Sequence, residues 1–414
     1  MVRSIALQLY KVIILLTCLT TSVSGYSQGF FEFSGSHKRE AIPFSYHRNL
    51  IIIPVYINDH GPYHFILDTG VNFLILTNPD LKKDLGITIG KTIIIRGLGE
   101  GNDIHAGILS DLDLAIGNIK GRHFTAAIFP EDLMPFSSYV GMQVDGIIGN
   151  DLFRQFTICI DYSRQMMVIH KSNTWKPGKR FESHDLDILN QRPYMVIPAT
   201  LTTGVDVFLR MIVDTGAGHP LSLEAGSIPQ LVLPPGALPA RIGVGLNGPI
   251  QGVLSRVPLL GIGKTHLQNV ICSYPIYTGK QINRPDDGRN GNIGNGILDH
   301  YQVVFDYVNE KIWFKKSNRL HKPFEYDMSG LDLISGGAEF RNYIVSGVDP
   351  GSPAAEAGLK EQDIILFIDL VPVNAISITD IDNMLRSGNG KKLHVVYQRR
   401  GKVEMTTLVL QRRV

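Results

Sequence analysis

Two copies of the tripeptide Asp-Thr-Gly are the residues of this chain best suited to do chemistry. Asp68 begins the copy in FILDTGVNFLIL, and Asp214 begins the copy in MIVDTGAGHPLSL. In each case an apolar run that predicts a buried strand ends at the acid, and a second apolar run follows. A buried carboxylate is costly unless another group compensates it. Two such acids in matching contexts indicate that each acid is compensated by the other.

A longer internal repeat surrounds the two tripeptides. Residues 146–172 and 291–317 align without a gap and share Gly-x-Ile-Gly-Asn, Asp-Tyr and Lys-Ser. A repeat of this length is typical of a duplicated domain rather than of a solenoid unit. We therefore expect two copies, residues 49–172 and 191–318, joined by a polar linker at 173–190.

Composition bounds the class of protein. The 414 residues are 44% hydrophobic and 19% charged and include 42 glycines, and many short β-branched runs favour a mainly β fold. The formal net charge is +2, which falls to zero without Arg3 and Lys11 of the N-terminal segment. This balance gives no electrostatic reason to expect nucleic acid or an anionic membrane as a partner.

The N-terminus predicts an exported protein, periplasmic or extracellular. Residues 1–27 carry positive charge, a short apolar run at 12–20 and small residues before Gln28, which is typical of a secretory signal peptide. Lipoprotein processing at Cys18 is the alternative, and it fits less well because Thr17 is large for its position. We expect no membrane span elsewhere, because no other stretch is long and apolar enough.

The remaining cysteines and the histidines predict no metal site and no cofactor. Cys159 and Cys272 fall in apolar runs at positions that are not equivalent in the repeat, so we expect two separate buried thiols. The histidines lack metal-ligand spacing. His219 follows the second acid closely and either borders the site or serves packing.

The twin acids imply a specific chemistry if the copies pack about a pseudo-twofold axis. The carboxyl groups of Asp68 and Asp214 then meet and share one proton, which drives their pKa values apart. The ionised acid can take a proton from a water molecule, and the protonated acid can donate to a carbonyl under attack. One chain supplies both acids, so we expect catalysis without dimerisation.

The residues that follow each acid support this chemistry. Gly70 and Gly216 let the backbone turn sharply and present amides to the carboxyl groups. The hydroxyl groups of Thr69 and Thr215 can brace the two turns against each other.

The chain resembles a two-lobed aspartic peptidase of the pepsin/retropepsin type over residues 49–318. The resemblance rests on the two Asp-Thr-Gly turns and on the apolar-apolar-Gly segments at 147–149 and 292–294. It implies a pseudo-twofold acid-protease β-barrel fold, and the proton-sharing pair is the known behaviour of that family's dyad. Two positions depart from the family: Val71, where Ser, Thr or Ala is usual, and Asn292, where an apolar residue is usual.

Glycine-rich hairpins follow each Asp-Thr-Gly turn at matching distances. The resemblance implies that they form flaps that close over a substrate and exclude water. The candidate flap residues are Gly97 and Gly99 in the first copy and Gly243 and Gly245 in the second.

Residues 325–414 resemble a bacterial-type PDZ domain, a small α+β fold. Gly330, Leu331, Asp332 and Leu333 match its carboxylate-binding loop. PDZ domains take an extended peptide beside an edge strand and hold its terminal carboxylate with backbone amides. The resemblance therefore implies a peptide ligand at this groove.

These features together predict an exported aspartic endopeptidase in which the PDZ domain binds or positions a peptide or protein substrate. The alternative is a catalytically inactive peptidase-fold scaffold whose PDZ domain binds peptides. Val71 and Asn292 motivate that alternative.

Overall fold

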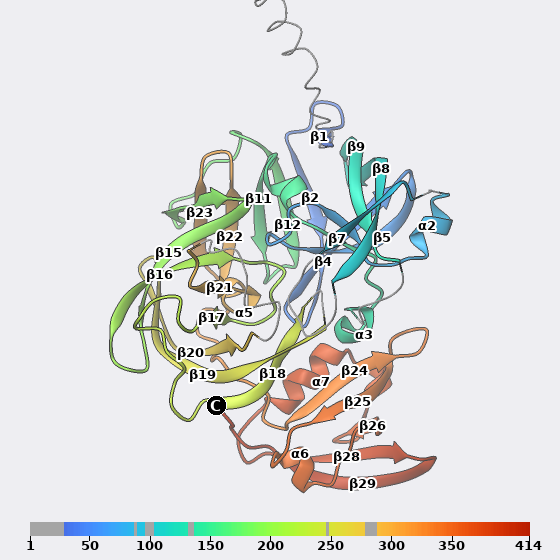
Figure 1. Ribbon diagram of the computed structural model, residues 1–414, viewed down its shortest axis with the longest axis vertical. Coiled ribbons are helices and arrows are strands. Elements are labelled where there is room, and N and C mark those ends of the chain that lie inside the picture. Colours follow the sequence, from blue (N-terminus) through green and yellow to red (C-terminus); the bar gives the residue numbers. More distant parts are fainter. Residues whose placement is uncertain (1–28, 87–88, 96–102, 131–135, 246–247, 278–287) are drawn as a thin grey trace, which may run out of the picture.

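The computed structural model describes residues 29–86, 89–95, 103–130, 136–245, 248–277 and 288–414 (Figure 1). Strands dominate these residues and the helices are short, so the mainly β fold expected from the sequence is confirmed. The expected signal peptide and the flap residues Gly97 and Gly99 lie outside the described residues.

The first lobe is built on one sheet with the strand order β1-β9-β6-β10-β5-β4-β8-β7, with β3 paired to β4. Its strands are β1 (Phe30–Phe33), β3 (Ser45–His47), β4 (Leu50–Ile57), β5 (His60–Leu67), β6 (Leu74–Leu76), β7 (Lys91–Ile95), β8 (Ile104–Ile116), β9 (Ile119–Ile128) and β10 (Gly146–Ile148). Strand β5 leads into Asp68, and β10 lies parallel beside it.

The second lobe has its own sheet, in the order β14-β15-β16-β21-β17-β20-β19-β18. Its strands are β14 (Asp187–Leu189), β15 (Arg192–Thr200), β16 (Asp206–Val213), β17 (Leu221–Leu223), β18 (Leu238–Gly245), β19 (Gly248–Ile262), β20 (Thr265–Pro275) and β21 (Gly291–Ile293). The order β16-β21-β17-β20-β19 matches β5-β10-β6-β9-β8 strand for strand. The sequence repeat is therefore a repeat of topology.

A third sheet joins the lobes, in the order β13-β23-β22-β11-β12-β2. Its strands are β2 (Arg39–Pro43), β11 (Phe156–Asp161), β12 (Met166–Lys171), β13 (Glu182–Asp185), β22 (Tyr301–Asp306) and β23 (Lys311–Lys316). Strands β11 and β22 come from the two copies and pair antiparallel, with Cys159 opposite Val304. Backbone hydrogen bonds thus run directly from one lobe to the other.

Two segments expected to lie outside the lobes contribute strands to the sheets. Residues 28–48 were expected to precede the first copy, yet they supply β1, β2 and β3. The expected linker at 173–190 contains β13 and β14, which pair with β23 and β15. Both segments cover sheet edges that the repeat alone would leave unpaired.

Short helices α4 (Asn150–Phe153) and α5 (Asn295–Leu298) occupy equivalent places in the two lobes, directly after the apolar-apolar-Gly segments. Helices α2 (Leu81–Asp84) and α3 (Phe136–Val140) belong to the first lobe. Phe136 and Val140 of α3 pack into a buried cluster that includes Ile66 and Ile147.

The C-terminal unit has a sheet in the order β24-β25-β26-β28-β29, with β27 paired to β26. Its elements are β24 (Leu331–Gly336), β25 (Asn342–Val348), α6 (Pro353–Glu356), β26 (Ile364–Ile368), β27 (Val371–Pro372), η2 (Val373–Ala375), α7 (Ile378–Leu385), β28 (Lys392–Arg399) and β29 (Lys402–Val409). Ser352 caps α6, and Ser377 with Asp380 forms a capping box at the start of α7.

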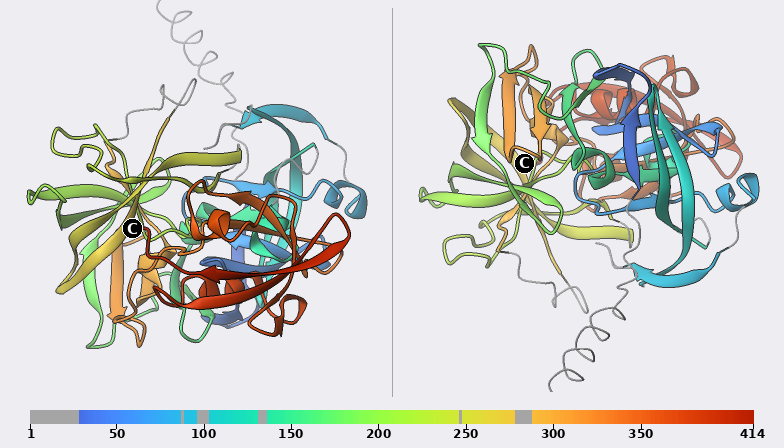
Figure 2. Two further views of the ribbon diagram at one scale, coloured as in Figure 1. Left: turned by 90° about the horizontal axis from the view of Figure 1, so that it is seen from below. Right: turned by 90° about the horizontal axis from the view of Figure 1, so that it is seen from above.

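The C-terminal unit has a hydrophobic core of its own, centred on residues such as Leu333, Ile381 and Leu393. Seen from below, it lies in front of the first lobe (Figure 2). Helix α3 of that lobe contacts its edge strand β24.

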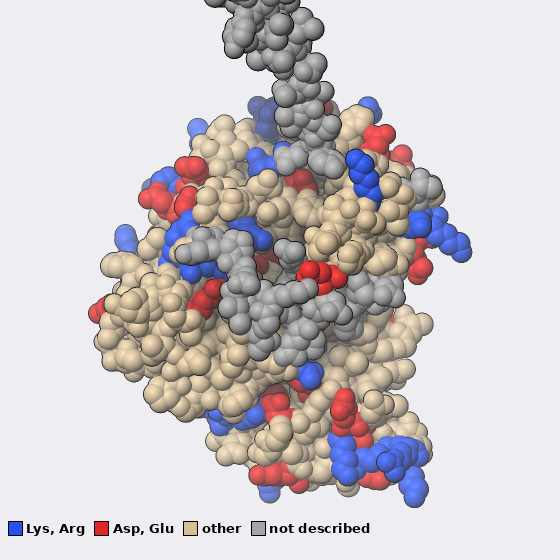
Figure 3. All heavy atoms as spheres, in the orientation of Figure 1, with Lys and Arg blue, Asp and Glu red and all other residues tan. Residues whose placement is uncertain are grey.

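The described residues contain no helix that is both long and apolar enough to cross a membrane. On the face shown in Figure 3, acidic and basic side chains are interspersed. This mixture is consistent with the near-neutral formal charge.

Candidate active site

The two acids leave their strands in the same way. The amide of Asp68, after β5, donates to the carbonyl of Ile148 at 2.9 Å, and the amide of Asp214, after β16, donates to the carbonyl of Ile293 at 2.8 Å. Strands β10 and β21 therefore continue the pairing of β5 and β16 up to the acid itself. Each acid is fixed by an interior strand rather than by a free loop.

Glycine is required where the apolar-apolar-Gly segments pass behind the acid turns. A Cβ on Gly149 would lie 1.8 Å from the carbonyl oxygen of Asp68. A Cβ on Gly294 would lie 2.1 Å from the carbonyl oxygen of His219 and 2.6 Å from that of Ala217. Any side chain at either position would push the turn out of place.

The two threonines tie the turns together across the lobe interface. Thr69 Oγ1 donates to the carbonyl of Val213 at 2.6 Å and accepts from the amide of Thr215 at 3.0 Å. Thr215 Oγ1 donates to the carbonyl of Leu67 at 2.9 Å and accepts from the amide of Thr69 at 3.1 Å. Both side chains are fully buried. These four bonds hold the two turns at a fixed separation.

The two carboxyl groups meet at the centre of this arrangement. Asp68 Oδ1 accepts from the amide of Gly70 at 2.6 Å, and Asp214 Oδ1 accepts from the amide of Gly216 at 3.0 Å. The two side chains also hydrogen-bond to each other. A Cβ on Gly216 would lie 2.1 Å from Asp68 Cγ, so only glycine lets the carboxyl groups come this close.

The pair holds a proton at neutral pH. Burial and the neighbouring Asp214 carboxylate raise the pKa of Asp68 to about 8, against the opposing effects of the Gly70 amide and of Arg192. Two adjacent buried carboxylates cannot both ionise without a large electrostatic cost. Because the acids titrate as a pair, the raised pKa describes the dyad as well as Asp68.

Asn292 makes the two acids unequal. Its side-chain amide donates to Asp214 Oδ2 at 2.8 Å, so both oxygens of that carboxylate accept a donor. Neither Val71 nor Ala217, the residues after the two glycines, carries a hydroxyl that could donate. Ile147 is the equivalent of Asn292 beside Asp68 and offers no donor. The two carboxyl groups therefore differ in the number of hydrogen-bond donors that they face.

Two more side chains complete the surroundings of the dyad. Arg192 of β15 donates through Nε to the carbonyl of Gly70 at 3.0 Å. His219 lies beside Asn292, and burial lowers its pKa, which keeps its imidazole neutral. His219 thus borders the site and also lines a neighbouring cavity.

The candidate flap residues of the second lobe lie in a hairpin. Gly243 and Gly245 are in β18 and face Ile250 and Gly248 of β19, with an irregularity in pairing between Arg241 and Gly243. A Cβ on Gly243 would meet no atom within 4 Å. The tip of this hairpin and the flap candidates of the first lobe lie outside the described residues.

The loop expected to bind a peptide carboxylate makes some of its hydrogen bonds within its own chain. Gly330 has a φ of +75°, and a Cβ there would lie 2.2 Å from Ser352 Cβ. The amides of Ser329 and Gly330 both donate to Asp327 Oδ2, and the amide of Leu331 donates to Ser329 Oγ. Asp327 thus takes the amide of Gly330, the first residue of the expected loop.

The rest of the expected loop has other roles. Leu333 is buried in the core of the C-terminal unit. Asp332 forms an ion pair with Arg241 of the second lobe, 3.4 Å apart.

The described residues contain no cluster of three or more His, Cys, Asp or Glu side chains that could hold a metal ion. Cys159 and Cys272 are free and buried, as expected, and burial raises the pKa of both thiols.

Two contributors were not identified as functional from the sequence. Asn292 was visible there as a departure from the family, but the donor it supplies could not be read from one position. Arg48, which links the first lobe to α7, belongs to no recognisable motif, and its partners Asp382 and Tyr139 are distant in the sequence.

Comparison with known families agrees with this geometry. A family model described as "Aspartyl protease" matches residues 53–152, which contain Asp68, and one described as "PDZ domain" matches residues 344–399. The chain therefore contains an aspartyl protease domain and a C-terminal PDZ domain. The second lobe lies outside the first match and is related to it by the repeat.

Other comparisons add little. No curated protein matches the chain. Among solved structures, the photosystem II D1 C-terminal processing protease is 23% identical over 24% of this chain and 26% of that chain, with a TM-score of 0.21. The match spans about a quarter of that protein, so nothing of its activity transfers to this one.

We predict that Thr215→Val destabilises the fold by about 1–3 kcal/mol, because it leaves the buried Leu67 carbonyl and Thr69 amide without their partner. The free energy of unfolding in denaturant measures this. The matched control is Thr157→Val. Thr157 is as deeply buried, but its Oγ1 has no hydrogen-bond partner in the described part of the chain. Equal losses in the two variants would contradict the bracing role.

We also predict that stability falls as pH rises from about 5 to 8. The folded pKa of Asp68 lies above its unfolded value, so across this window the native state holds a proton that the unfolded state has lost. Asp68→Asn should flatten the slope. Asp185→Asn is the control, because Asp185 is exposed and Lys311 lowers its pKa, so its contribution is constant above about pH 5. An unchanged slope in Asp68→Asn would contradict the shared proton.

Proposed function

We propose that the chain is an aspartic-type endopeptidase that hydrolyses peptide bonds with a water molecule activated by Asp68 and Asp214. The observation that carries the proposal is the meeting of two half-buried carboxyl groups, each at the end of an interior strand and each bonded to the glycine amide of its own turn. A partly desolvated acid pair of this kind is costly to a structure and useful to catalysis.

The asymmetry at the dyad assigns the roles. Asp214, with donors on both oxygens, is the charged member and removes a proton from water. The resulting hydroxide adds to the carbonyl carbon of the substrate, and the proton on Asp68 goes to the carbonyl oxygen. Collapse of the tetrahedral intermediate breaks the C–N bond. The proton held by Asp214 passes to the leaving amine, and one hydroxyl proton of the intermediate returns to Asp68, which restores the starting dyad. Neither a metal ion nor a covalent intermediate takes part in this sequence.

The first lobe's match to aspartyl proteases supports the reaction class. The second lobe repeats the strand order, the Asp-Thr-Gly turn and the Gly contact behind it, which supports a complete site within one chain. We further propose that the β18–β19 hairpin acts as a flap over substrate. An exported location follows from the character of residues 1–27 and belongs to the same proposal.

The inactive-scaffold alternative has one observation in its favour, the lack of a hydroxyl at Val71. The missing hydroxyl beside Asp68 is offset in part by Asn292, which supplies a donor to Asp214, the other acid of the pair. The bonded carboxyl groups favour the active form.

We predict that Asp214→Asn and Asp68→Asn each lower the rate of peptide cleavage by about 10²–10⁴-fold. The measurement is mass-spectrometric cleavage of an undirected peptide library across pH. Activity of the unaltered chain should fall above about pH 8, where the proton of the dyad is lost. Asp206→Asn is the control, since Asp206 is exposed and lies on β16, the strand that leads into Asp214. Cleavage that survives Asp214→Asn would contradict the mechanism.

We predict that Asn292→Ile, which copies Ile147 of the other lobe, lowers the rate of peptide cleavage by about tenfold, because Asp214 loses one of its two hydrogen-bond donors. Adding Ile147→Asn offers a donor beside Asp68 instead and should restore part of the rate. An unchanged rate in Asn292→Ile would show that Asn292 only packs.

A further inference from the structure

The groove of the PDZ domain faces the peptidase lobes. Its two walls are the edge strand β24 and helix α7, and residues of both line a cavity of about 530 Å³ where the domain meets the lobes. Gly218 and His219, which follow the Asp214 turn, line the same cavity. A ligand in the groove would therefore lie against the lobes rather than in solvent.

One end of this groove is occupied by the first lobe. Ser335 Oγ of β24 donates to the carbonyl of Ser138 in α3 at 2.7 Å. A Cβ on Gly141, just after α3, would lie 2.8 Å from Ile378 Cγ2 of α7. The segment 138–141 therefore touches both walls of the groove, at the place where an added peptide strand would run.

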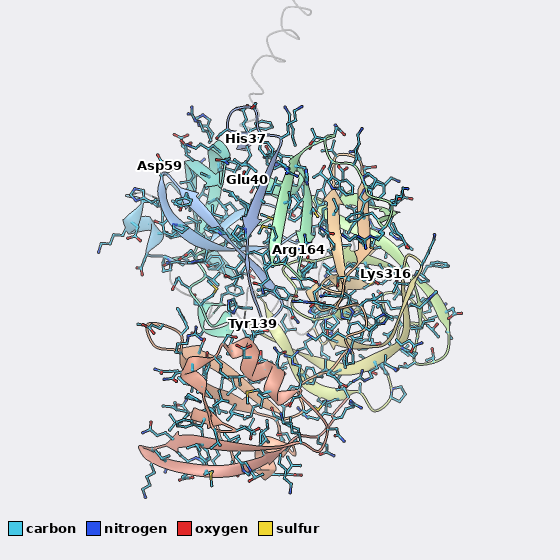
Figure 4. All side chains as sticks on the ribbon, turned by 180° about the vertical axis from the view of Figure 1, so that it is seen from behind. His37, Glu40, Asp59, Tyr139, Arg164 and Lys316 are labelled. Carbon is cyan, nitrogen blue, oxygen red and sulfur yellow. The ribbon has the colours of Figure 1, made fainter. Side chains whose placement is uncertain are left out.

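Arg48 fixes this contact. Its guanidinium makes a two-pronged ion pair with Asp382 of α7, at 2.8 and 3.0 Å, and donates to the carbonyl of Tyr139 at 2.9 Å. The Arg48 amide donates to Thr379 Oγ1 at 2.9 Å, and the guanidinium lies over the Tyr139 ring. Tyr139 lies at the boundary between the first lobe and the PDZ domain (Figure 4). The Arg48 side chain is only 9% exposed, and paired charges buried this deeply are costly to separate.

The residue next to Arg48 reaches the catalytic turn of the other lobe. Asn49 Nδ2 donates to the carbonyl of Gly218 at 2.8 Å, and its own carbonyl accepts from Asn295 Nδ2 at 2.7 Å. Asn295 Nδ2 also donates to the carbonyl of Thr215 at 2.6 Å. Arg48 and Asn49 are both in the left-handed conformation, with φ of 47° and 62°, so the turn between them is tight. One tight turn thus connects α7 to the Asp214 loop.

We infer that the groove of this PDZ domain has lobe 1 of its own chain as its partner, and that this docking positions the catalytic turns. Residues 138–141 and Arg48 occupy one end of the strand-helix groove, and Asp327 takes the amide of Gly330 at the start of the carboxylate loop. The PDZ domain therefore acts as a clamp, that is, it holds the peptidase lobes in place, rather than as a receptor for the C-termini of other chains. Arg48 is the positioning residue: it acts on the dyad through Asn49, and α3 acts through its packing beside Ile66 and Ile147.

The catalytic consequence rests on the proposed peptidase function, whereas the docking does not. The first test is therefore amide hydrogen exchange on the full chain. Arg48→Ala and Asp382→Asn should each raise exchange by about tenfold or more in α7 and also in residues 214–219. The Arg48 backbone carbonyl lies against Gly218, whereas the hydrogen bonds of its side chain go to Asp382 and Tyr139, so both substitutions leave that backbone contact in place. Exchange in Arg48→Lys should lie between that of Arg48→Ala and that of the unaltered chain, because lysine keeps the positive charge but cannot make the two-pronged ion pair. Arg164→Ala is the control, since Arg164 is 85% exposed in the β11–β12 turn (Figure 4).

Exchange that rises only in α7 and residues 136–141, with 214–219 unchanged, would overturn the positioning role. Exchange that rises nowhere would overturn the docking. Peptide cleavage then separates the two proposals. If the unaltered chain cleaves peptides, Arg48→Ala should lower kcat by about tenfold with little change in KM. If it cleaves none, the peptidase proposal fails while the exchange result still decides the clamp.

A binding measurement tests the occupancy of the groove and of its carboxylate loop. The probe is a pool of synthetic decapeptides with a free C-terminal carboxylate, compared with the same pool amidated at the C-terminus. Because Asp327 already takes the Gly330 amide and lobe 1 occupies one end of the groove, the unaltered chain should bind the two pools equally. Binding of the free-carboxylate pool that is about tenfold tighter would overturn the inference.

Discussion

The close approach of two half-buried carboxyl groups is the constraint on which the rest of the structure depends. Two acids within hydrogen-bond reach repel each other when both are charged. The neighbouring residues must therefore hold them together, and the two acids share a proton. The surroundings are the two threonine hydroxyls, buried and bonded across the lobe interface. The duplication of the lobe brings the ends of two equivalent strands, β5 and β16, to one point.

Glycines set how closely the parts approach. Gly216 lies against the Asp68 carboxyl group, and Gly149 and Gly294 let β10 and β21 pass behind the acid turns. Behind these lies the sheet in which β11 and β22 pair, so the lobes are joined by backbone bonds as well as by side chains. The result is a rigid frame with one deliberate asymmetry. Asn292 supports the charge of Asp214, and Ile147 leaves Asp68 without such support.

Much of the frame could be predicted from the sequence, because the sequence patterns that specify it are local and occur twice. The strand-acid-Thr-Gly pattern and the repeat of Gly-x-Ile-Gly-Asn identified both acids, both bracing threonines and the mainly β fold. The strands before residue 49 and within 173–190 were missed. Of these, β1, β2 and β13 pair with strands that are distant in the sequence, and β3 and β14 are only three residues long. Asn292 was seen as a departure, but its bond to Asp214 depends on how two strands align.

The PDZ domain shows the limit of reading function from a motif. The domain was expected at residues 325–414, yet Arg48 and the segment 138–141 occupy one end of its groove, and their meeting is a property of tertiary structure alone. A family resemblance identifies the receptor surface of a domain, whereas the contacts of the whole chain show whether that surface is free.

Carbon-13 NMR of the chain labelled at aspartate carboxyl carbons would test the shared proton most directly. We expect one carboxyl signal that titrates near pH 8 and disappears in Asp68→Asn. If the signals of both acids instead titrate in the usual range near pH 4, the two groups do not share a proton, and the proposed mechanism is wrong.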